Sequence, residues 1–366
     1  MLIDIIAGAR PNFMKIAPII NVIKLKNKIG VDINYRLIHT GQHYDQNMSG
    51  NFFEQLDIPE PDINLGAGGG TQAEQTAAIM IGYERVLLNQ APQLCIVVGD
   101  VTSTMACSIT AKKMNIPIAH VEAGIRSGDW SMPEEINRIT TDSITDYFFT
   151  TSSVANANLR KSGVGENQIF FVGNTMIDTL VKNRNRFRKS ELWEKFGLKS
   201  GKYIVMTLHR PSNVDEEEVL KSLINEILNN SKDFPIIFPV HPRTRKIFEK
   251  LGIKHNRLFL VDPLGYLEFN YLVERSKAVI TDSGGITEET TFMSIPCITL
   301  RDSTERPETC TIGTNELIGT NPIAIKHVLE KLFSGNWKNG AIPELWDGET
   351  SSRIVEHIIN IFGLKF

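Results

Sequence analysis

Residues 277–289 read KAVITDSGGITEE, and this stretch decides the fold class. Its apolar run has the length and β-branched content of a buried strand, and the small and polar residues after it lead into a helical pattern. This alternation predicts an α/β fold in which helices cover parallel strands. The same succession recurs at 2–8, 34–41, 94–100, 116–124, 147–152, 169–174, 203–210, 235–242, 257–263 and 296–302.

A change of pattern divides the chain of 366 residues, which is long enough for two domains. Between Val181 and Gly201 the sequence is charged and has no strand character, and strand signals resume at Tyr203. We therefore expect two Rossmann-type domains at 1–182 and 183–351, with a cleft between them. The last stretch, 352–366, has the pattern of an amphipathic helix and is assigned to the first domain.

Composition excludes several classes of protein. With 42% hydrophobic and 22% charged residues and a net charge of -3, the chain is neither disordered nor basic enough to favour nucleic acid or an anionic membrane. The four cysteines form no metal-binding spacing, and the apolar start reaches Arg10 too early for a signal peptide or a membrane span. We expect a cytoplasmic protein with reduced thiols and no metal.

The strongest phosphate-binding signal lies in residues 282–289, DSGGITEE. Ser283, Gly284 and Gly285 open a predicted helix, so a hydroxyl and successive backbone N–H groups can hold a diphosphate at its positive end. Glu289, about one turn further on, can accept hydrogen bonds from the hydroxyls of a ribose. A simple capping box is the alternative, but it explains one glycine and not two.

Two other glycine-containing segments were weighed as phosphate sites. Gly8 and Arg10 close the first strand, and Pro11 suits the first turn of a helix that carries Lys15. This segment can hold phosphate, or it is a tight turn with a solvated arginine. The run GAGGG at 66–70 lacks the spacing of known phosphate loops and is predicted to be a flexible surface loop.

Carboxylates follow several strands of the first half. Asp100 and Glu122 end strands, and Glu134 begins a helix that also holds Arg138. Clustered carboxylates shift one another's pKa values apart, so that one acts as an acid and another as a base. Each of them taken singly is better explained as a helix cap than as a catalytic group.

Cationic groups follow strands of the second half. His209 and Arg210 end one strand, while His241 and Arg243 end the next. They predict a cationic wall that stabilises an anionic leaving group. The remaining histidines are assigned to packing, capping or the surface: His39, His43, His120, His255, His327 and His357.

Nine ordered motifs together carry a resemblance to a known family: GARPNFMKIAPI, TGQHYDQNMS, GDVTST, HVEAGIRSGD, MPEEINR, TLHRPSNVD, PVHPRT, DSGGITEE and RDSTERPE. They resemble, in this order and over nearly the whole chain, the non-hydrolysing UDP-N-acetylglucosamine 2-epimerases. The resemblance implies a GT-B-like pair of domains, a homodimer, and no nicotinamide or metal requirement. It also implies inversion at C2 of UDP-GlcNAc through loss of UDP, giving 2-acetamidoglucal, and its re-addition.

The resemblance assigns roles residue by residue. The implied catalytic set is Asp100, Glu122, Glu134 and His209. The implied nucleotide-binding set is Arg10, Lys15, Ser283, Gly284, Gly285, Glu289 and Arg306. Arg138 and His241 are implied to lie near the sugar and diphosphate, with Phe269 against the uracil.

The motif after the second strand departs from many bacterial members, which bind a second, activating UDP-GlcNAc there. Tyr44 and Asp45 replace the residues of their QHRxML motif, and Ala77 aligns with a downstream arginine. An aspartate repels a diphosphate, so we expect catalysis without substrate activation.

Three alternatives remain open. A 2-epimerase of a UDP-2,3-diacetamido sugar or its uronate shares the TGQHYDxNMS motif. A GT-B glycosyltransferase has little use for the carboxylates of HVEAG and PEEINR. A catalytically silent nucleotide-sugar sensor is expected to lack one of the four implied catalytic residues, and all four are present.

Overall fold

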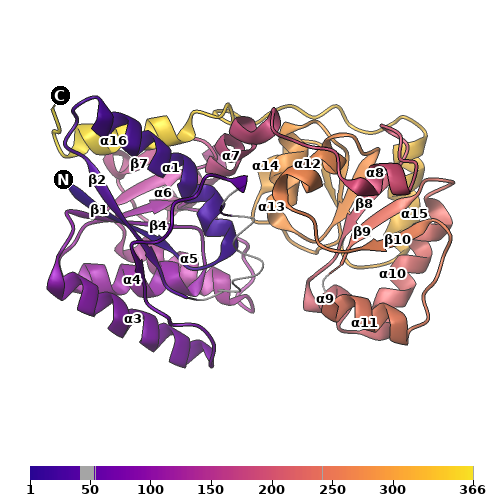
Figure 1. The fold of residues 1–366 in the computed structure, drawn as a ribbon, viewed down its shortest axis with the longest axis horizontal. Helices are drawn as coiled ribbons and strands as arrows, with labels where there is room; N and C mark the ends of the chain where they lie inside the picture. The colour runs from indigo at the N-terminus through magenta and orange to yellow at the C-terminus, as the bar shows by residue number, and fades with distance from the viewer. Residues whose placement is uncertain (42–52, 54, 241, 366) are drawn as a thin grey trace. The chain divides into compact units, whose positions relative to one another are not determined.

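A computed structural model of the chain describes residues 1–41, 53, 55–240 and 242–365 (Figure 1). The chain forms two compact units, one made of Met1–Lys182 and Glu344–Phe366 and the other of Asn183–Pro343. The sequence placed the domain limits at 182/183 and 351/352, so the return to the first unit comes earlier than that expectation. Both units are α/β, as predicted.

The first unit contains a seven-stranded sheet with the order β3-β2-β1-β4-β5-β6-β7, in which every pair is parallel. Helices α1 and α16 lie over one face of this sheet and α3 and α4 over the other (Figure 1). The strand order reverses between β1 and β4, and open α/β sheets bind ligands at such points, outside the carboxyl ends of the strands. The strands are β1 Leu2–Ala7, β2 Asn34–His39, β3 Ile63–Asn64, β4 Leu94–Val98, β5 Ile118–Val121, β6 Tyr147–Thr150 and β7 Ile169–Phe171. The helices are α1 Arg10–Lys28, α3 Gln72–Asn89, α4 Thr102–Lys113, α5 Pro133–Ile144, α6 Ser153–Lys161, α7 Thr175–Arg184 and α16 Thr350–Ile361, with a 3₁₀ turn at Glu166–Gln168.

The second unit repeats this plan with six parallel strands in the order β10-β9-β8-β11-β12-β13. Its order reverses between β8 and β11. The strands are β8 Ile204–Thr207, β9 Ile236–Pro239, β10 Leu258–Val261, β11 Ala278–Thr281, β12 Cys297–Thr299 and β13 Asn315–Leu317. The helices are α8 Glu191–Lys195, α9 Pro211–Val214, α10 Glu217–Asn230, α11 Pro242–Lys250, α12 Tyr266–Glu274, α13 Gly284–Phe292, α14 Pro307–Thr311 and α15 Ile323–Phe333.

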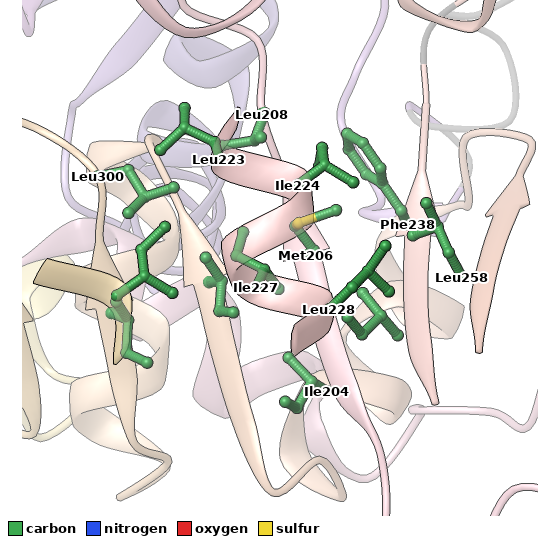
Figure 2. Close-up of a cluster of buried hydrophobic side chains, with 14 of the residues drawn as sticks. Ile204, Met206, Leu208, Leu223, Ile224, Ile227, Leu228, Phe238, Leu258 and Leu300 are labelled. Atoms are coloured by element: carbon green, nitrogen blue, oxygen red, sulfur yellow. The ribbon is translucent and has the colours of Figure 1, made fainter. Parts of the chain in front are cut away.

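Apolar periodicity explains the core of the second unit (Figure 2). Ile204 and Met206 point to the same face of β8, because side chains alternate along a strand. Against them pack Ile224 and Ile227 of α10, which are spaced at i and i+3 and therefore share one face of that helix. This packing fixes the position of β8, whose end carries His209.

The C-terminal segment is tied into the first unit by buried contacts. The Trp346 indole Nε1 donates to the carbonyl oxygen of Thr151 at 3.2 Å. Asp178 of α7 accepts from the backbone N–H groups of Thr350 at 3.1 Å and Ser351 at 2.6 Å, and so caps α16 from another element. Burial raises the pKa of the Asp178 carboxyl above its ordinary value. Because Trp346 already contacts the first unit, the chain rejoins that unit before the helix predicted at 352–366.

Candidate active site

The loop between β1 and α1 is fixed by one asparagine. The Oδ1 of Asn12 accepts from the backbone N–H groups of Gly8 at 3.1 Å and Ala9 at 2.9 Å, and its Nδ2 donates to the carbonyl of Val98 at 3.2 Å. The buried Asn12 thereby joins the ends of β1 and β4 at the switch point. Arg10 begins α1 from this loop, and its side chain is exposed.

Glu122, directly after β5, forms a buried ion pair with Lys15 of α1. The Nζ of Lys15 lies 2.7 Å from Oε2 of Glu122, whose side chain is only 2% exposed. Glu122 has a φ of +69°, a left-handed conformation that is costly for a residue with a side chain. The structure therefore holds this carboxylate by backbone conformation and by charge, which is more than a helix cap requires.

Asp100, after β4, is paired with Arg138 of α5. The Nε and Nη2 of Arg138 lie 3.0 and 2.5 Å from Oδ2 of Asp100, while Nη1 donates to Glu135 at 2.8 Å. Asn137 donates to the Asp100 carbonyl oxygen at 2.8 Å. Arg138 is 5% exposed and Asp100 is 31% exposed, so the carboxylate faces solvent from a buried anchor.

Glu134 and Glu135 begin the same helix, but the structure separates their environments. Glu135 is buried and accepts from the backbone N–H groups of Ser127 and Gly128 at 2.9 and 3.0 Å. Burial alone would raise the pKa of Glu135, but these donors and Arg138 hold it below its ordinary value. Glu134 is half-buried at the second position of α5. The two neighbours differ because only Glu135 anchors the loop that follows β5.

In the second unit, His209 is anchored through Asp282. Its Nδ1 lies 2.7 Å from Oδ1 of the buried Asp282, while 62% of the imidazole side chain is exposed. Asp282 also accepts from the backbone N–H groups of His209 and Arg210, at 3.0 and 2.9 Å to Oδ2. Burial opposes ionisation of Asp282, but His209 and these N–H groups hold its pKa below the ordinary value. The carboxylate thus orients the ring.

The start of α13 has the properties of an anion site. Gly284 begins the helix, and the Ser283 side chain makes no capping hydrogen bond to it. A Cβ on Gly285 would meet no atom within 4 Å, and one on Gly284 would lie 3.7 Å from Nη1 of Arg301. The simple cap that the sequence left open is thus absent at Ser283, and the ion pair of Arg301 with Glu305 lies beside the helix start.

Glu289 lies deeper in α13 than its sequence position suggested. It is buried, and its Oε1 accepts from the Tyr266 hydroxyl at 2.8 Å and from Nδ2 of Asn270 at 3.5 Å. Burial raises the pKa of Glu289 to about 7. Phe269 is half-buried on α12, between these two partners in the sequence. Arg306 is buried and forms an ion pair with Glu288.

Most of the residues predicted for a site lie among the described residues. Some belong to the first unit and the others to the second. Lys15 and Glu122 are in contact in the first unit, as are Asp100 and Arg138, and Ser283, Gly284 and Gly285 adjoin in the second. His241 lies outside the described residues, as do His43, Tyr44 and Asp45. Ala77 is exposed on α3.

Comparison with known proteins identifies the family of the chain. A family model described as UDP-N-acetylglucosamine 2-epimerase matches residues 25–359. The chain belongs to this family.

Members of this epimerase family resemble the chain along its full length. The UDP-N-acetylglucosamine 2-epimerase of Methanocaldococcus jannaschii is 41% identical, covering 97% of this chain and 98% of that protein. A crystal structure of the Methanocaldococcus jannaschii UDP-GlcNAc 2-epimerase in complex with UDP-GlcNAc and UDP has a TM-score of 0.86 at 39% identity, covering 98% and 100% of the two chains. The UDP-2,3-diacetamido-2,3-dideoxy-D-glucuronate 2-epimerase of Pseudomonas aeruginosa is 39% identical over 99% of this chain and 100% of that protein. The expected fold class, GT-B-like with two Rossmann-type domains, is confirmed.

Sequence reasoning missed several anchors of the candidate site. Asn12, Asp142 and Tyr266 make buried contacts to the predicted residues or to their loops, and His120 was assigned only to packing, capping or the surface. Asn12 and His120 fall within two of the quoted motifs, which is the only sign of them in the sequence. Asp142 and Tyr266 are recognised only as buried polar residues of helices. Among the described residues, no group of three or more His, Cys, Asp or Glu side chains can hold a metal ion, and no helix is long and apolar enough to cross a membrane.

Proposed function

We propose that this chain interconverts UDP-GlcNAc and UDP-ManNAc without a nicotinamide cofactor or a metal. The observation that carries the proposal is the pair of anchored carboxylates, Asp100 with Arg138 and Glu122 with Lys15, at the strand ends of a family member. A carboxylate held by a buried cation has a defined position from which to move a proton.

The second unit is proposed to bind the nucleotide. The N–H groups that open α13, with Ser283, Gly284 and Gly285, would meet the diphosphate. Glu289 would accept from the ribose, and Phe269 would stack on the uracil. Arg306, His241, Arg10 and Lys15 complete the set that we propose around the nucleotide and sugar.

The first unit is proposed to act on the sugar ring. One of Asp100, Glu122 and Glu134 removes the C2 proton, the C1–O bond breaks, and UDP leaves with the electron pair of that bond. The product of this elimination is 2-acetamidoglucal. UDP then adds to C1 again while a proton is delivered to the opposite face of C2, and His209 stabilises the charge on the leaving diphosphate.

The wider assignments follow from this reaction. We propose a homodimer in the cytoplasm that supplies UDP-ManNAc for cell-surface polysaccharide. The net charge of -3 supports a small anionic substrate held by local cations rather than a polyanionic partner.

The test is to incubate the purified chain with UDP-GlcNAc in D₂O, with a chelator and no added NAD. Proton NMR should show UDP-ManNAc forming and deuterium replacing hydrogen at C2 of both sugars. The absence of both changes would reject the proposal.

One observation favours a second candidate. The 39% identity to the diacetamido-glucuronate 2-epimerase is close to the 41% identity to the UDP-GlcNAc enzyme. The same experiment with the UDP-diacetamido uronate separates the two, because turnover of the uronate alone would identify it as the substrate.

A further inference from the structure

The ring of His120, on β5, lies between two hydrogen-bond acceptors. Its Nδ1 is 2.7 Å from Oδ1 of Asp142, and its Nε2 is 2.8 Å from the carbonyl oxygen of Gly99. The side chain is 1% exposed. No water therefore supplies an alternative partner, and the two protein groups determine which ring nitrogens carry protons.

Both partners require a donor. A carbonyl oxygen only accepts, so Nε2 carries a proton. Asp142 also accepts, through Oδ2, from Nη1 of Arg126 at 2.6 Å and from the Gly124 N–H at 3.1 Å. Burial opposes ionisation of Asp142, but His120 and Arg126 hold its pKa below the ordinary value. An ionised carboxylate only accepts, so Nδ1 carries a proton too and the ring is an imidazolium.

This cation adjoins the peptide that carries Asp100. The Gly99 carbonyl belongs to the Gly99–Asp100 peptide, and the Gly99 N–H donates to the carbonyl of Val121, next to Glu122, at 3.0 Å. A Cβ on Gly99 would lie 3.3 Å from Nζ of Lys15 and 3.8 Å from Oε2 of Glu122. One glycine thus separates the imidazolium from the Lys15–Glu122 pair.

The charged groups around the ring balance one another once Glu135 is counted, since Arg138 pairs with both Asp100 and Glu135. Asp142 of α5 is the anion, and Arg126 and the ring itself are cations. Lys15 of α1 and Arg138 of α5 already neutralise the two carboxylates that lie beyond Gly99. The imidazolium therefore offsets the remaining carboxylate of this network, Glu135.

We propose that His120 is a positioning residue of the epimerase reaction. Its imidazolium donates to the Gly99 carbonyl and so fixes the Gly99–Asp100 peptide, and with it the position of the Asp100 carboxylate. This inference rests on the proposed function, because removal of a weakly acidic C–H proton needs a base that is both ionised and precisely placed.

The charge state is tested by ¹⁵N NMR of histidine-labelled protein, with the His120→Gln spectrum as the assignment. We expect both ring nitrogens of His120 to be protonated at neutral pH, because each of them faces an acceptor. His39 on β2 is the internal comparison, because burial lowers the pKa of its imidazole. The centroid of its ring lies 5.2 Å from that of the Phe13 ring. An unprotonated nitrogen on His120 at neutral pH would overturn the proposal.

Asp142→Asn separates charge from geometry. The amide can donate to Nδ1, so the ring becomes neutral while Nε2 still donates to Gly99. We expect kcat to fall about tenfold at unchanged KM, because a neutral ring makes a weaker hydrogen bond to the Gly99 carbonyl than an imidazolium does. His120→Phe also removes the donor to Gly99, and kcat should fall about a hundredfold.

The half-buried His357 of α16 provides the control, and His357→Gln should leave the kinetics unchanged. Equal loss of UDP affinity and kcat in Asp142→Asn, or a wild-type kcat in that variant, would overturn the proposal. A wild-type chain that fails to epimerise UDP-GlcNAc would reject the proposed function, while the NMR measurement would still decide whether the cation exists.

Discussion

The two units share one strand order but hold their polar groups in different ways. In the first unit, Asp100 and Glu122 are each paired with a cationic side chain from a helix. In the second, the buried Asp282 is held chiefly by backbone N–H groups and an imidazole, and the neighbouring helix opens on glycines.

This difference teaches how one topology serves two tasks. Ion-paired carboxylates retain their charge and position, which suits proton transfer. Backbone N–H groups at a helix start present donors without a mobile side chain, which suits binding of a diphosphate. We therefore expect variants of the first unit to lower kcat and variants of the second to weaken binding.

The largest effect is expected from the carboxylates of the first unit. Asp100→Asn, Glu122→Gln or Glu134→Gln should lower kcat by ~10² or more while UDP still binds, because acid and base groups act mainly in the transition state. Steady-state kinetics and calorimetry with UDP measure the two quantities. Glu166→Gln, at an exposed ion pair with Arg160, is the control and should leave both unchanged. Near-normal turnover in all three variants would show that these carboxylates act only as helix caps.

A pH-dependent stability is expected from Glu289 in the second unit. Its pKa is raised from 4.5 to about 7, so the folded state holds the proton more tightly than the unfolded state does. The unfolding free energy of the wild type should therefore fall as pH rises from 4.5 to 7, by on the order of 3 kcal/mol from this group. Glu289→Gln lacks this loss, so its stability relative to wild type should rise over that range.

Urea denaturation at a series of pH values measures this difference. Glu135→Gln in the first unit is the matched control, because the pKa of Glu135 is lowered and its contribution is lost only below the ordinary value of 4.5. A relative stability of Glu289→Gln that stays constant between pH 4.5 and pH 8 would contradict the assignment.

A smaller effect is expected at the start of α13. Ser283→Ala removes one hydroxyl from the proposed diphosphate site, and UDP should bind about tenfold more weakly, while kcat changes little. Calorimetry with UDP, alongside kcat at saturating substrate, would measure both. Ser334→Ala, in the exposed turn after α15, serves as the control. A loss of kcat at unchanged UDP affinity would contradict the proposal that the second unit binds the nucleotide while the first acts on the sugar.

The smallest effect is expected from added activator. Asp45 would repel the diphosphate of a second UDP-sugar, and Ala77 provides no cation on α3. UDP-ManNAc should therefore be epimerised at once without UDP-GlcNAc, and the forward saturation curve should be hyperbolic. A long lag that a trace of UDP-GlcNAc abolishes would show that an activator site exists with other ligands.

Much of the fold could be predicted because periodicity and strand-end residues are local signals. The structure contains the helix after Arg10, the helix that holds Glu134 and Arg138, and the helix that opens on Gly284. Strands β3 and β13, of two and three residues, were missed because such short segments show no periodicity. The run 66–70 forms no helix or strand, as predicted, but a Cβ on Gly68 would lie 2.4 Å from the Gly41 carbonyl oxygen, so part of this loop packs tightly.

The sequence by itself determined the α/β class, the chemistry-bearing residues at the strand ends and the family, because these depend on residue type and local order. Only the tertiary structure decided which of those residues are paired. Lys15 and Glu122 lie 107 positions apart, and the partners of His120 are a strand-end carbonyl and a helix carboxylate. The protonation of a buried ring depends on the groups that surround it in space, and sequence spacing alone does not specify them.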